Sequence, residues 1–137
     1  LLEITLKKII LLLTLLTLSL FAEAKNSYMT QEILDSDMAI VDVRTSPEWI
    51  ETGLLKGAIP IVFFNQNGKP EINKFLKELQ EKVDVKKPFA IICHTGSRTS
   101  MIAPWLAENF NYNVINIVGG MEYATKGLKM KTHPYKK

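Results

Sequence analysis

A regular alternation of strand-like and helix-like segments after residue 24 constrains the fold more than any other feature. Short apolar, β-rich runs, which predict strands, lie at 38–43, 58–64, 88–93 and 114–118. Segments with the spacing and end signals of helices lie at 30–34, 47–52, 71–83, 97–110 and 121–125. Thr30 is a candidate N-cap for the first of them. Strands that alternate with helices form βαβ units, so we expect an α/β domain built on a mostly parallel sheet.

The first 24 residues have the pattern of a secretory signal peptide. Two lysines precede an apolar run at 9–21, and Ala22-Glu23-Ala24 provides a small-x-small cleavage site. A run of about thirteen apolar residues is short for a membrane span, which needs roughly 20. We therefore expect cleavage, a mature domain at 25–137 with no membrane attachment, and export, with a bacterial periplasm as the simplest destination. An uncleaved anchor is the alternative.

Charge and cysteine content narrow the classes of function. The formal net charge is only +3, and no aromatic residues are interleaved with a basic stripe, which argues against nucleic-acid binding. The chain has one cysteine, Cys93, so it cannot form an intramolecular disulfide. In an exported protein a single cysteine indicates a reactive thiol or pairing between chains, although inert buried cysteines are also common. An exposed thiol here could link two copies under oxidation.

A short segment between a predicted strand and a predicted helix, Cys93-His94-Thr95-Gly96-Ser97-Arg98, has the properties of an anion-binding nucleophile site. The start of a helix favours the thiolate, which is the nucleophilic form. A curled loop can turn successive main-chain amides towards an anion, and Gly96 permits the backbone angles that this requires. Arg98 adds a positive charge whose planar fork suits sulfonate, sulfate-like or phosphate groups. Because strand ends share one edge of a parallel sheet, Asp42 should lie on the same edge as Cys93.

These residues resemble the rhodanese family over nearly all of the expected mature chain. The strand–Cys-x4-Arg–helix segment is similar to the active-site loop of that family. The stretches that resemble its first signature are Ile40-Val41-Asp42-Val43-Arg44, Glu48-Trp49, Gly53 and Gly57-Ala58-Ile59-Pro60. Its closing segment resembles 114–120 with Tyr123 and Gly127. Leu54, Met121, Tyr123 and Met130 depart from the family pattern, which leaves the substrate preference open.

The resemblance implies a rhodanese-like three-layer α/β fold, in which a five-stranded parallel sheet has helices on both faces. It also implies that Cys93 takes a sulfane sulfur from a small anionic donor, thiosulfate or polysulfide, and passes it to a thiol, cyanide or protein acceptor. Such a two-stage covalent reaction predicts ping-pong kinetics and requires no metal or organic cofactor. Cys93 and Arg98 would be catalytic, and the amides of 94–98 would hold the persulfide. The substrate-binding residues would be His94, Thr95, Gly96, Ser97, Thr99, Asp42 and Arg44.

Individual side chains have more than one interpretation. The hydroxyl of Thr99 could donate to the thiolate, whereas His94 should point outward and line the substrate path rather than act as a base. We expect Asp42 and Arg44 to support the loop, with Glu48 as a partner of Arg44. The alternative is that Asp42 caps a turn and Arg44 makes a structural ion pair.

Two other functions compete with sulfur transfer. The protein could carry a persulfide or polysulfide with little turnover of its own. It could instead be a phosphatase or arsenate reductase, although the related phosphatases use a loop one residue longer than the one between Cys93 and Arg98. The enzymatic interpretation requires loop amides that surround the sulfur, and it would fail if the Cys93 side chain packed away in the interior.

Overall fold

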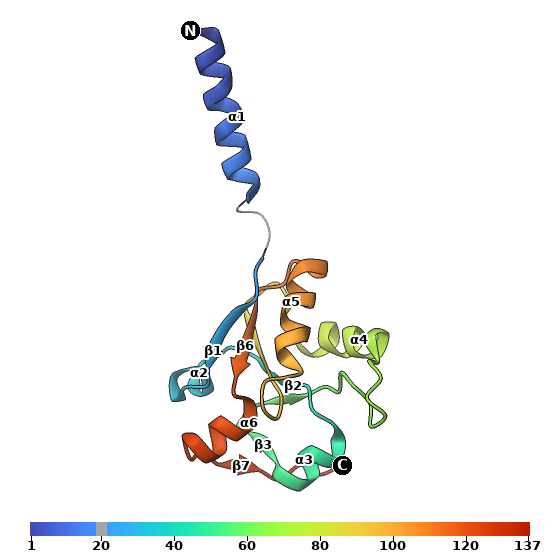
Figure 1. The fold of residues 1–137 in the computed structure, drawn as a ribbon. Coiled ribbons are helices and arrows are strands. Elements are labelled where there is room, and N and C mark those ends of the chain that lie inside the picture. Colours follow the sequence, from blue (N-terminus) through green and yellow to red (C-terminus); the bar gives the residue numbers. More distant parts are fainter. Residues whose placement is uncertain (19–21) are drawn as a thin grey trace.

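A computed structural model describes residues 1–18 and 22–137. Its first helix, α1 (Leu2–Leu18), projects from one end of an α/β domain (Figure 1). Within the described residues, no helix combines the length and the apolar character that crossing a membrane requires. The end of the apolar run assigned to the signal peptide, residues 19–21, lies outside the described residues.

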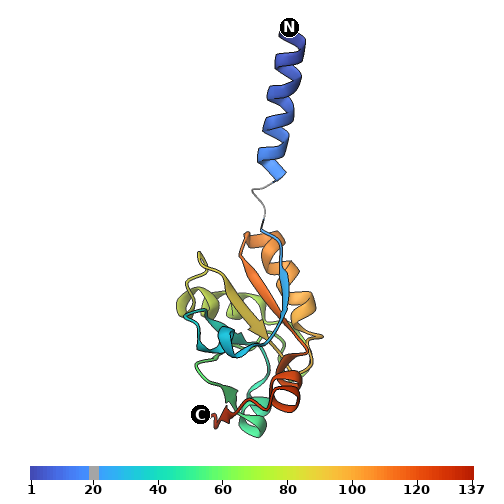
Figure 2. The same ribbon diagram turned by 90° about the vertical axis from the view of Figure 1, so that its left-hand side faces the viewer.

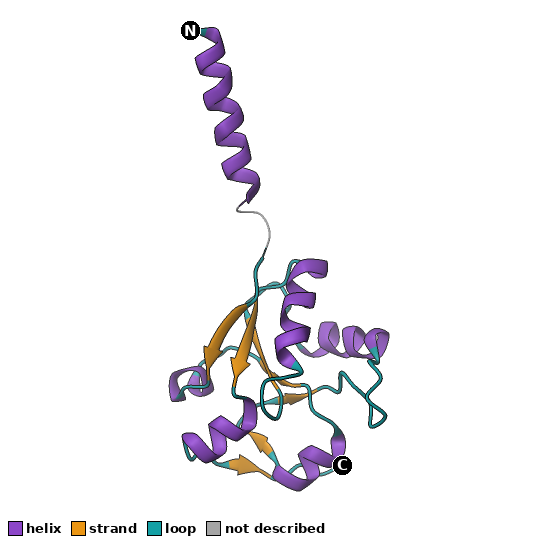
Figure 3. Ribbon diagram, viewed as in Figure 1, coloured by secondary structure: helices purple, strands orange, loops and turns teal. Residues whose placement is uncertain are grey.

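A five-stranded parallel sheet in the order β1-β6-β5-β2-β4 forms the centre of the domain (Figure 3). Three predicted strands are confirmed, and they are β2 (Ile40–Asp42), β5 (Phe89–Ile92) and β6 (Val114–Val118). The predicted strand at 58–64 is regular only in β4 (Ile59–Pro60). Beyond Pro60, the N–H groups of Ile61 and Phe63 still donate to the carbonyls of Asp42 and Val43, but the regular ladder has ended.

The sequence pattern missed the short and polar strands. Strand β1 (Lys25–Tyr28) lies at the sheet edge, is largely exposed and pairs only with β6, so it lacks the apolar run that marks a buried strand. Strands β3 (Leu54–Leu55) and β7 (Thr132–His133) form a separate antiparallel pair. Two residues are too few to show an alternation.

The predicted helices are all present. They are α2 (Gln31–Asp35), α3 (Ser46–Thr52), α4 (Ile72–Lys82), α5 (Thr99–Phe110) and α6 (Gly120–Glu122), which continues into the π-helical turn η1 (Tyr123–Gly127). Thr30 caps α2 as expected, because its hydroxyl oxygen accepts from the N–H of Ile33. Helix α5 begins at Thr99 rather than at residue 97, because the preceding residues complete the loop that follows β5.

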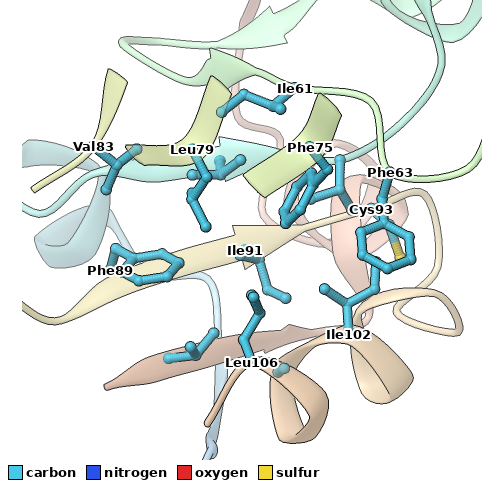
Figure 4. Close-up of a cluster of buried hydrophobic side chains, with 14 residues drawn as sticks. Ile61, Phe63, Phe75, Leu79, Val83, Phe89, Ile91, Cys93, Ile102 and Leu106 are labelled. Carbon is cyan, nitrogen blue, oxygen red and sulfur yellow. The ribbon is translucent and has the colours of Figure 1, made fainter. Parts of the chain in front are cut away.

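Helices lie on both faces of the sheet, as the three-layer prediction requires (Figures 1 and 2). Each face carries a separate apolar cluster. Side chains alternate along β5: Phe89 and Ile91 pack in the cluster with α4 and α5, whereas Ala90 and Ile92 pack in the other. Cys93 continues the first set, and Figure 4 shows its sulfur among these side chains. The fold thus aims the only cysteine at the layer covered by α4 and α5.

Candidate active site

The segment that follows β5, residues 93–98, curls around the sulfur of Cys93 before α5 begins; we call it the Cys93 loop. The N–H of Gly96 donates to Sγ at 3.2 Å, and Oγ1 of Thr99 lies 3.6 Å from Sγ. The same hydroxyl donates to the carbonyl of Gly96 at 3.3 Å. Gly96 has φ of +97°, a backbone conformation that glycine adopts without a steric penalty. The loop therefore places one amide and one hydroxyl beside the sulfur.

The thiol itself is buried, which corrects the expectation of an exposed cysteine. Cys93 is 0% exposed, because it continues the inward-facing set of β5 residues. Within the described part of the chain, Gly96 is the one residue whose main-chain N–H bonds Sγ, so the full ring of amides expected from the sequence does not surround the free thiol. The remaining loop side chains, His94, Thr95 and Ser97, are exposed, and His94 points outward as predicted.

The closing segment of the chain holds the loop from behind. The carbonyls of Cys93 and His94 accept hydrogen bonds from the N–H groups of Met121 at 2.8 Å and Glu122 at 3.0 Å. Gly120 has φ of +56°, and a Cβ there would overlap the carbonyl of Cys93 and lie 2.6 Å from that of His94. Because carbonyl and N–H point in opposite directions across a trans peptide, these bonds turn the N–H groups of residues 94 and 95 away from α6.

Arg98 pairs with Glu48, at the start of α3. Its Nη1 and Nη2 donate to the two carboxylate oxygens of Glu48 at 2.9 Å and 2.6 Å. The main-chain N–H and the hydroxyl of Thr45 donate to the same carboxylate at 2.9 Å and 2.8 Å. Burial alone would raise the pKa of Glu48, but the hydrogen bonds from Arg98 and Thr45 outweigh it and lower this pKa to about 2. Glu48 in turn raises the pKa of Arg98, and the nearby sulfur of Cys93 adds to this effect.

The expected pairing of Glu48 with Arg44 is therefore wrong. Arg44 instead bonds Asp42 through Nε and Nη2, at 3.0 Å and 2.8 Å, and reaches Thr52 and the carbonyl of Gly53 at the end of α3. The carboxylate of Asp42 is 0% exposed and Arg44 is 1% exposed. Neither can contact a substrate in this structure, so the alternative of a structural ion pair holds.

The Asp42–Arg44 pair supports the site indirectly. Asp42 also accepts from Nε1 of the buried Trp49 at 3.1 Å, so the end of β2 is tied to the middle and the end of α3. That helix carries Glu48 and thus fixes the position from which the carboxylate reaches the Cys93 loop. Two hydrogen-bonded networks, one buried and one half-buried, therefore meet at α3.

Sequence reasoning missed the roles of Glu48, Gly119 and Gly120 at this site. Gly119 packs closely on the Cys93 loop, since a Cβ on Gly96 would lie 3.1 Å from the main-chain N of Gly119. Glu48 was recognisable as a first-turn residue of a helix that follows β2, whose end lies on the same sheet edge as Cys93. The two glycines were visible as the end of β6, but their contact with the loop depends on chain packing. Within residues 1–18 and 22–137, no group of His, Cys, Asp and Glu side chains is arranged to hold a metal.

Comparisons with known proteins agree with this architecture. A model of the rhodanese-like domain matches residues 23–126. Uncharacterized protein RP600 of Rickettsia prowazekii is 32% identical over 108 residues, which cover 75% of this chain and 86% of RP600. The structure of Rv0390 from M. tuberculosis has a TM-score of 0.60 at 21% identity, over 72% of this chain and 80% of that chain. RPA3614 of Rhodopseudomonas palustris CGA009, described as a possible tyrosine phosphatase, has a TM-score of 0.52 at 19% identity, over 82% and 85% of the two chains.

At 21% and 19% identity, the likeness to these two solved structures shows only that the fold is shared. The family match includes both halves of the site, since it spans Glu48, the Cys93 loop and Gly120. With the five-stranded parallel sheet and a cysteine loop at its carboxyl edge, the chain belongs to the rhodanese-like domain family, whose members are generally sulfurtransferases.

Proposed function

We propose that the protein is a thiosulfate sulfurtransferase of the rhodanese type, which moves a sulfane sulfur from thiosulfate or polysulfide through Cys93 to a thiol, cyanide or protein acceptor. One observation carries the proposal: the loop between β5 and α5 brings a main-chain N–H to 3.2 Å and a hydroxyl to 3.6 Å from a single sulfur atom, and the same loop ends in the guanidinium of Arg98. These groups suit a sulfur that is anionic both before and after loading.

The proposed reaction has two covalent stages. In the first, the Cys93 thiolate attacks the sulfane sulfur of thiosulfate; a new S–S bond forms, the donor S–S bond breaks and sulfite leaves. In the second, a thiolate or cyanide attacks the outer sulfur of the persulfide, and Cys93 regains its thiolate. The N–H of Gly96 stabilises the inner sulfur, and the hydroxyl of Thr99 does so when it rotates from the carbonyl of Gly96 towards Sγ. Arg98 orients the anionic donor. Both stages balance in atoms and charge, and neither requires a metal.

Cys93 is buried, and one loop amide bonds its sulfur, which is the arrangement under which the enzymatic interpretation was expected to fail. The proposal therefore rests on the family match and on the groups beside the sulfur, and it requires the loop to move. Because Sγ has no exposed surface, the loop must open before a donor reaches it. The exposed side chains of His94, Thr95 and Ser97 form the outer wall of the loop and contact the entering donor. We therefore expect slow initial loading relative to a small free thiol of the same reactivity.

A kinetic panel on the full chain tests the proposal. Thiosulfate and a polysulfide are each combined with cyanide and a small thiol, and initial rates are fitted to ping-pong and sequential schemes. We expect parallel double-reciprocal lines, and no turnover by Cys93→Ser. The control is Glu108→Gln, which changes an exposed residue of α5 and should retain activity. Turnover by Cys93→Ser, or hydrolysis of an aryl phosphate without sulfur transfer, would reject the proposal.

The buried sulfur also favours a second candidate, a persulfide carrier with little turnover. A carrier would protect its loaded sulfur from small acceptors and release it only to a protein partner. The same panel separates the two functions, because a carrier loads sulfur on Cys93 yet shows slow transfer to every small acceptor.

We also propose that residues 1–24 act as an export signal. The first strand of the domain, β1, begins at Lys25, directly after the expected cleavage site, so removal of the leader would leave the sheet whole. Expression of the full chain in a bacterium, followed by N-terminal sequencing of the periplasmic fraction, should give a protein that begins at Lys25. An intact leader on a membrane-associated protein would instead support the anchor.

A further inference from the structure

We propose that Glu48 sets the donor class of the Cys93 loop: by neutralising Arg98 it disfavours dianionic donors such as thiosulfate relative to singly charged donors. The inference rests on the proposed sulfur transfer, which it deepens. It makes Glu48 a specificity-determining residue that acts through Arg98 and by its own charge.

The positive charge of Arg98 is fully paired with the carboxylate of Glu48. Both terminal nitrogens of its guanidinium donate to Glu48, and the two side chains are only 22% and 28% exposed. The carboxylate is held in turn by Thr45, so the pair is fixed to the start of α3. The low pKa of Glu48, about 2, keeps the carboxylate ionised at any ordinary assay pH.

The Cys93 loop has no second lysine or arginine whose positive charge could balance the negative charge of Glu48. Of the residues from Cys93 to Arg98, only Arg98 is a lysine or arginine. The other arginine near this sheet edge, Arg44, is buried and paired with Asp42. The charges of Arg98 and Glu48 cancel. When Cys93 reacts as a thiolate, the site therefore has a net charge of one negative unit. A dianion experiences twice the repulsion that a monoanion does.

Two donors of matched chemistry isolate this charge effect. Thiosulfate, a dianion, loads the thiolate and releases sulfite. Methanethiosulfonate, a monoanion, loads it by the same attack on a sulfane sulfur and releases methanesulfinate. In each case the Cys93–sulfur bond forms as the donor S–S bond breaks, and total charge is conserved. The two donors differ in charge and in the group that the sulfane sulfur carries, and both differences affect the ratio of their kcat/KM values in the wild type. A substitution that removes only a charge should change this ratio through the charge difference alone.

The test compares kcat/KM for the two donors in wild type and Glu48→Gln, with cyanide as acceptor. Glutamine keeps an oxygen for Arg98 while it removes the negative charge. We expect the thiosulfate-to-methanethiosulfonate ratio to rise about tenfold, equivalent to about 1.4 kcal/mol. The rise should shrink at about 1 M salt, where screening acts over roughly 3 Å. Glu51→Gln removes an exposed charge from the same helix and should leave the ratio unchanged.

The outcomes are distinct. An unchanged ratio in folded Glu48→Gln, with both donors slowed equally, would overturn the inference and show that Glu48 only positions Arg98. Glu48→Asp retains the charge, so it should retain the wild-type ratio even if its rates fall; a raised ratio there would also overturn the inference. If folded wild type accepts sulfur from neither donor, the proposed function itself fails, and the inference fails with it.

Discussion

The guanidinium of Arg98 meets the carboxylate of Glu48 at 2.9 Å and 2.6 Å, across 50 residues of sequence. This contact joins the loop after β5 to the helix after β2. The two strands are neighbours in the sheet, so their carboxyl ends deliver both side chains to one edge. The site is therefore a product of strand order as much as of the cysteine loop.

Arg98→Ala should reduce loading from anionic donors by roughly tenfold to hundredfold, because it removes a charged donor group and leaves Glu48 uncompensated. The fold should survive, since a partly exposed ion pair that contributes about 2 kcal/mol supplies only a fraction of the stability of a domain. In the double variant Arg98→Ala/Glu48→Gln, part of the lost thiosulfate activity should return. Steady-state kinetics and thermal unfolding measure both effects. Full turnover by Arg98→Ala would show that the guanidinium has no role.

The Glu48–Arg98 pair should make stability depend on acid pH. The pKa of Glu48 is lowered from 4.5 to about 2 in the folded protein, so its stabilising contribution is complete above about pH 5 and is lost as the pH falls towards 2. Partial exposure reduces the contribution to about 2 kcal/mol. Urea unfolding of wild type and Glu48→Gln should differ by this amount at neutral pH, and the difference should close near pH 2. A constant difference throughout would contradict this account.

Gly120→Ala should destabilise the protein and disrupt the Cys93 loop. Its Cβ would overlap the carbonyl of Cys93, and φ of +56° is strained for alanine. Gly57→Ala is the matched control, because Gly57 has a similar φ of +73° but no atom within 4 Å of the added Cβ. We expect a loss of about 1 kcal/mol for the control and at least about 3 kcal/mol for Gly120→Ala, with loss of loading. Equal losses in chemical denaturation would show that the contact is unimportant.

The sequence was sufficient for the central strands, for the helices and for the position of the cysteine loop, since these depend on local patterns. Apolar runs predicted β2, β5 and β6, and the capping residue Thr30 predicted α2. The sequence did not predict that the Cys93 side chain is buried. The side-chain alternation of β5 carries through to residue 93, but whether a cover lies over that position depends on how α4 and α5 pack.

Pairing among charged residues was likewise beyond the sequence. Glu48 lies four residues from Arg44 along the chain, which favoured that pairing, yet Arg44 turns inward to Asp42 at 0% exposure. Only the neighbouring positions of β2 and β5 bring Glu48 to Arg98. Local spacing thus predicts which charges are available, whereas strand order decides which of them meet.

Asp42→Ala should be strongly destabilising. It would leave the buried guanidinium of Arg44 without its carboxylate and remove the acceptor of Trp49. Breaking a buried pair in this way costs about 3–5 kcal/mol. The exposed Asp37→Ala is the control and should change the free energy of unfolding by less than about 0.5 kcal/mol. A similarly small effect for Asp42→Ala would mean that the buried network does not hold α3.

The most direct measurement is the intact mass of the protein after exposure to thiosulfate or polysulfide and removal of the excess. Wild type should gain about 32 Da, the mass of one sulfur atom, in a form that cyanide removes, and folded Cys93→Ser should gain nothing. A folded wild-type protein that gains no sulfur from either donor, or an equal gain by Cys93→Ser, would contradict the account.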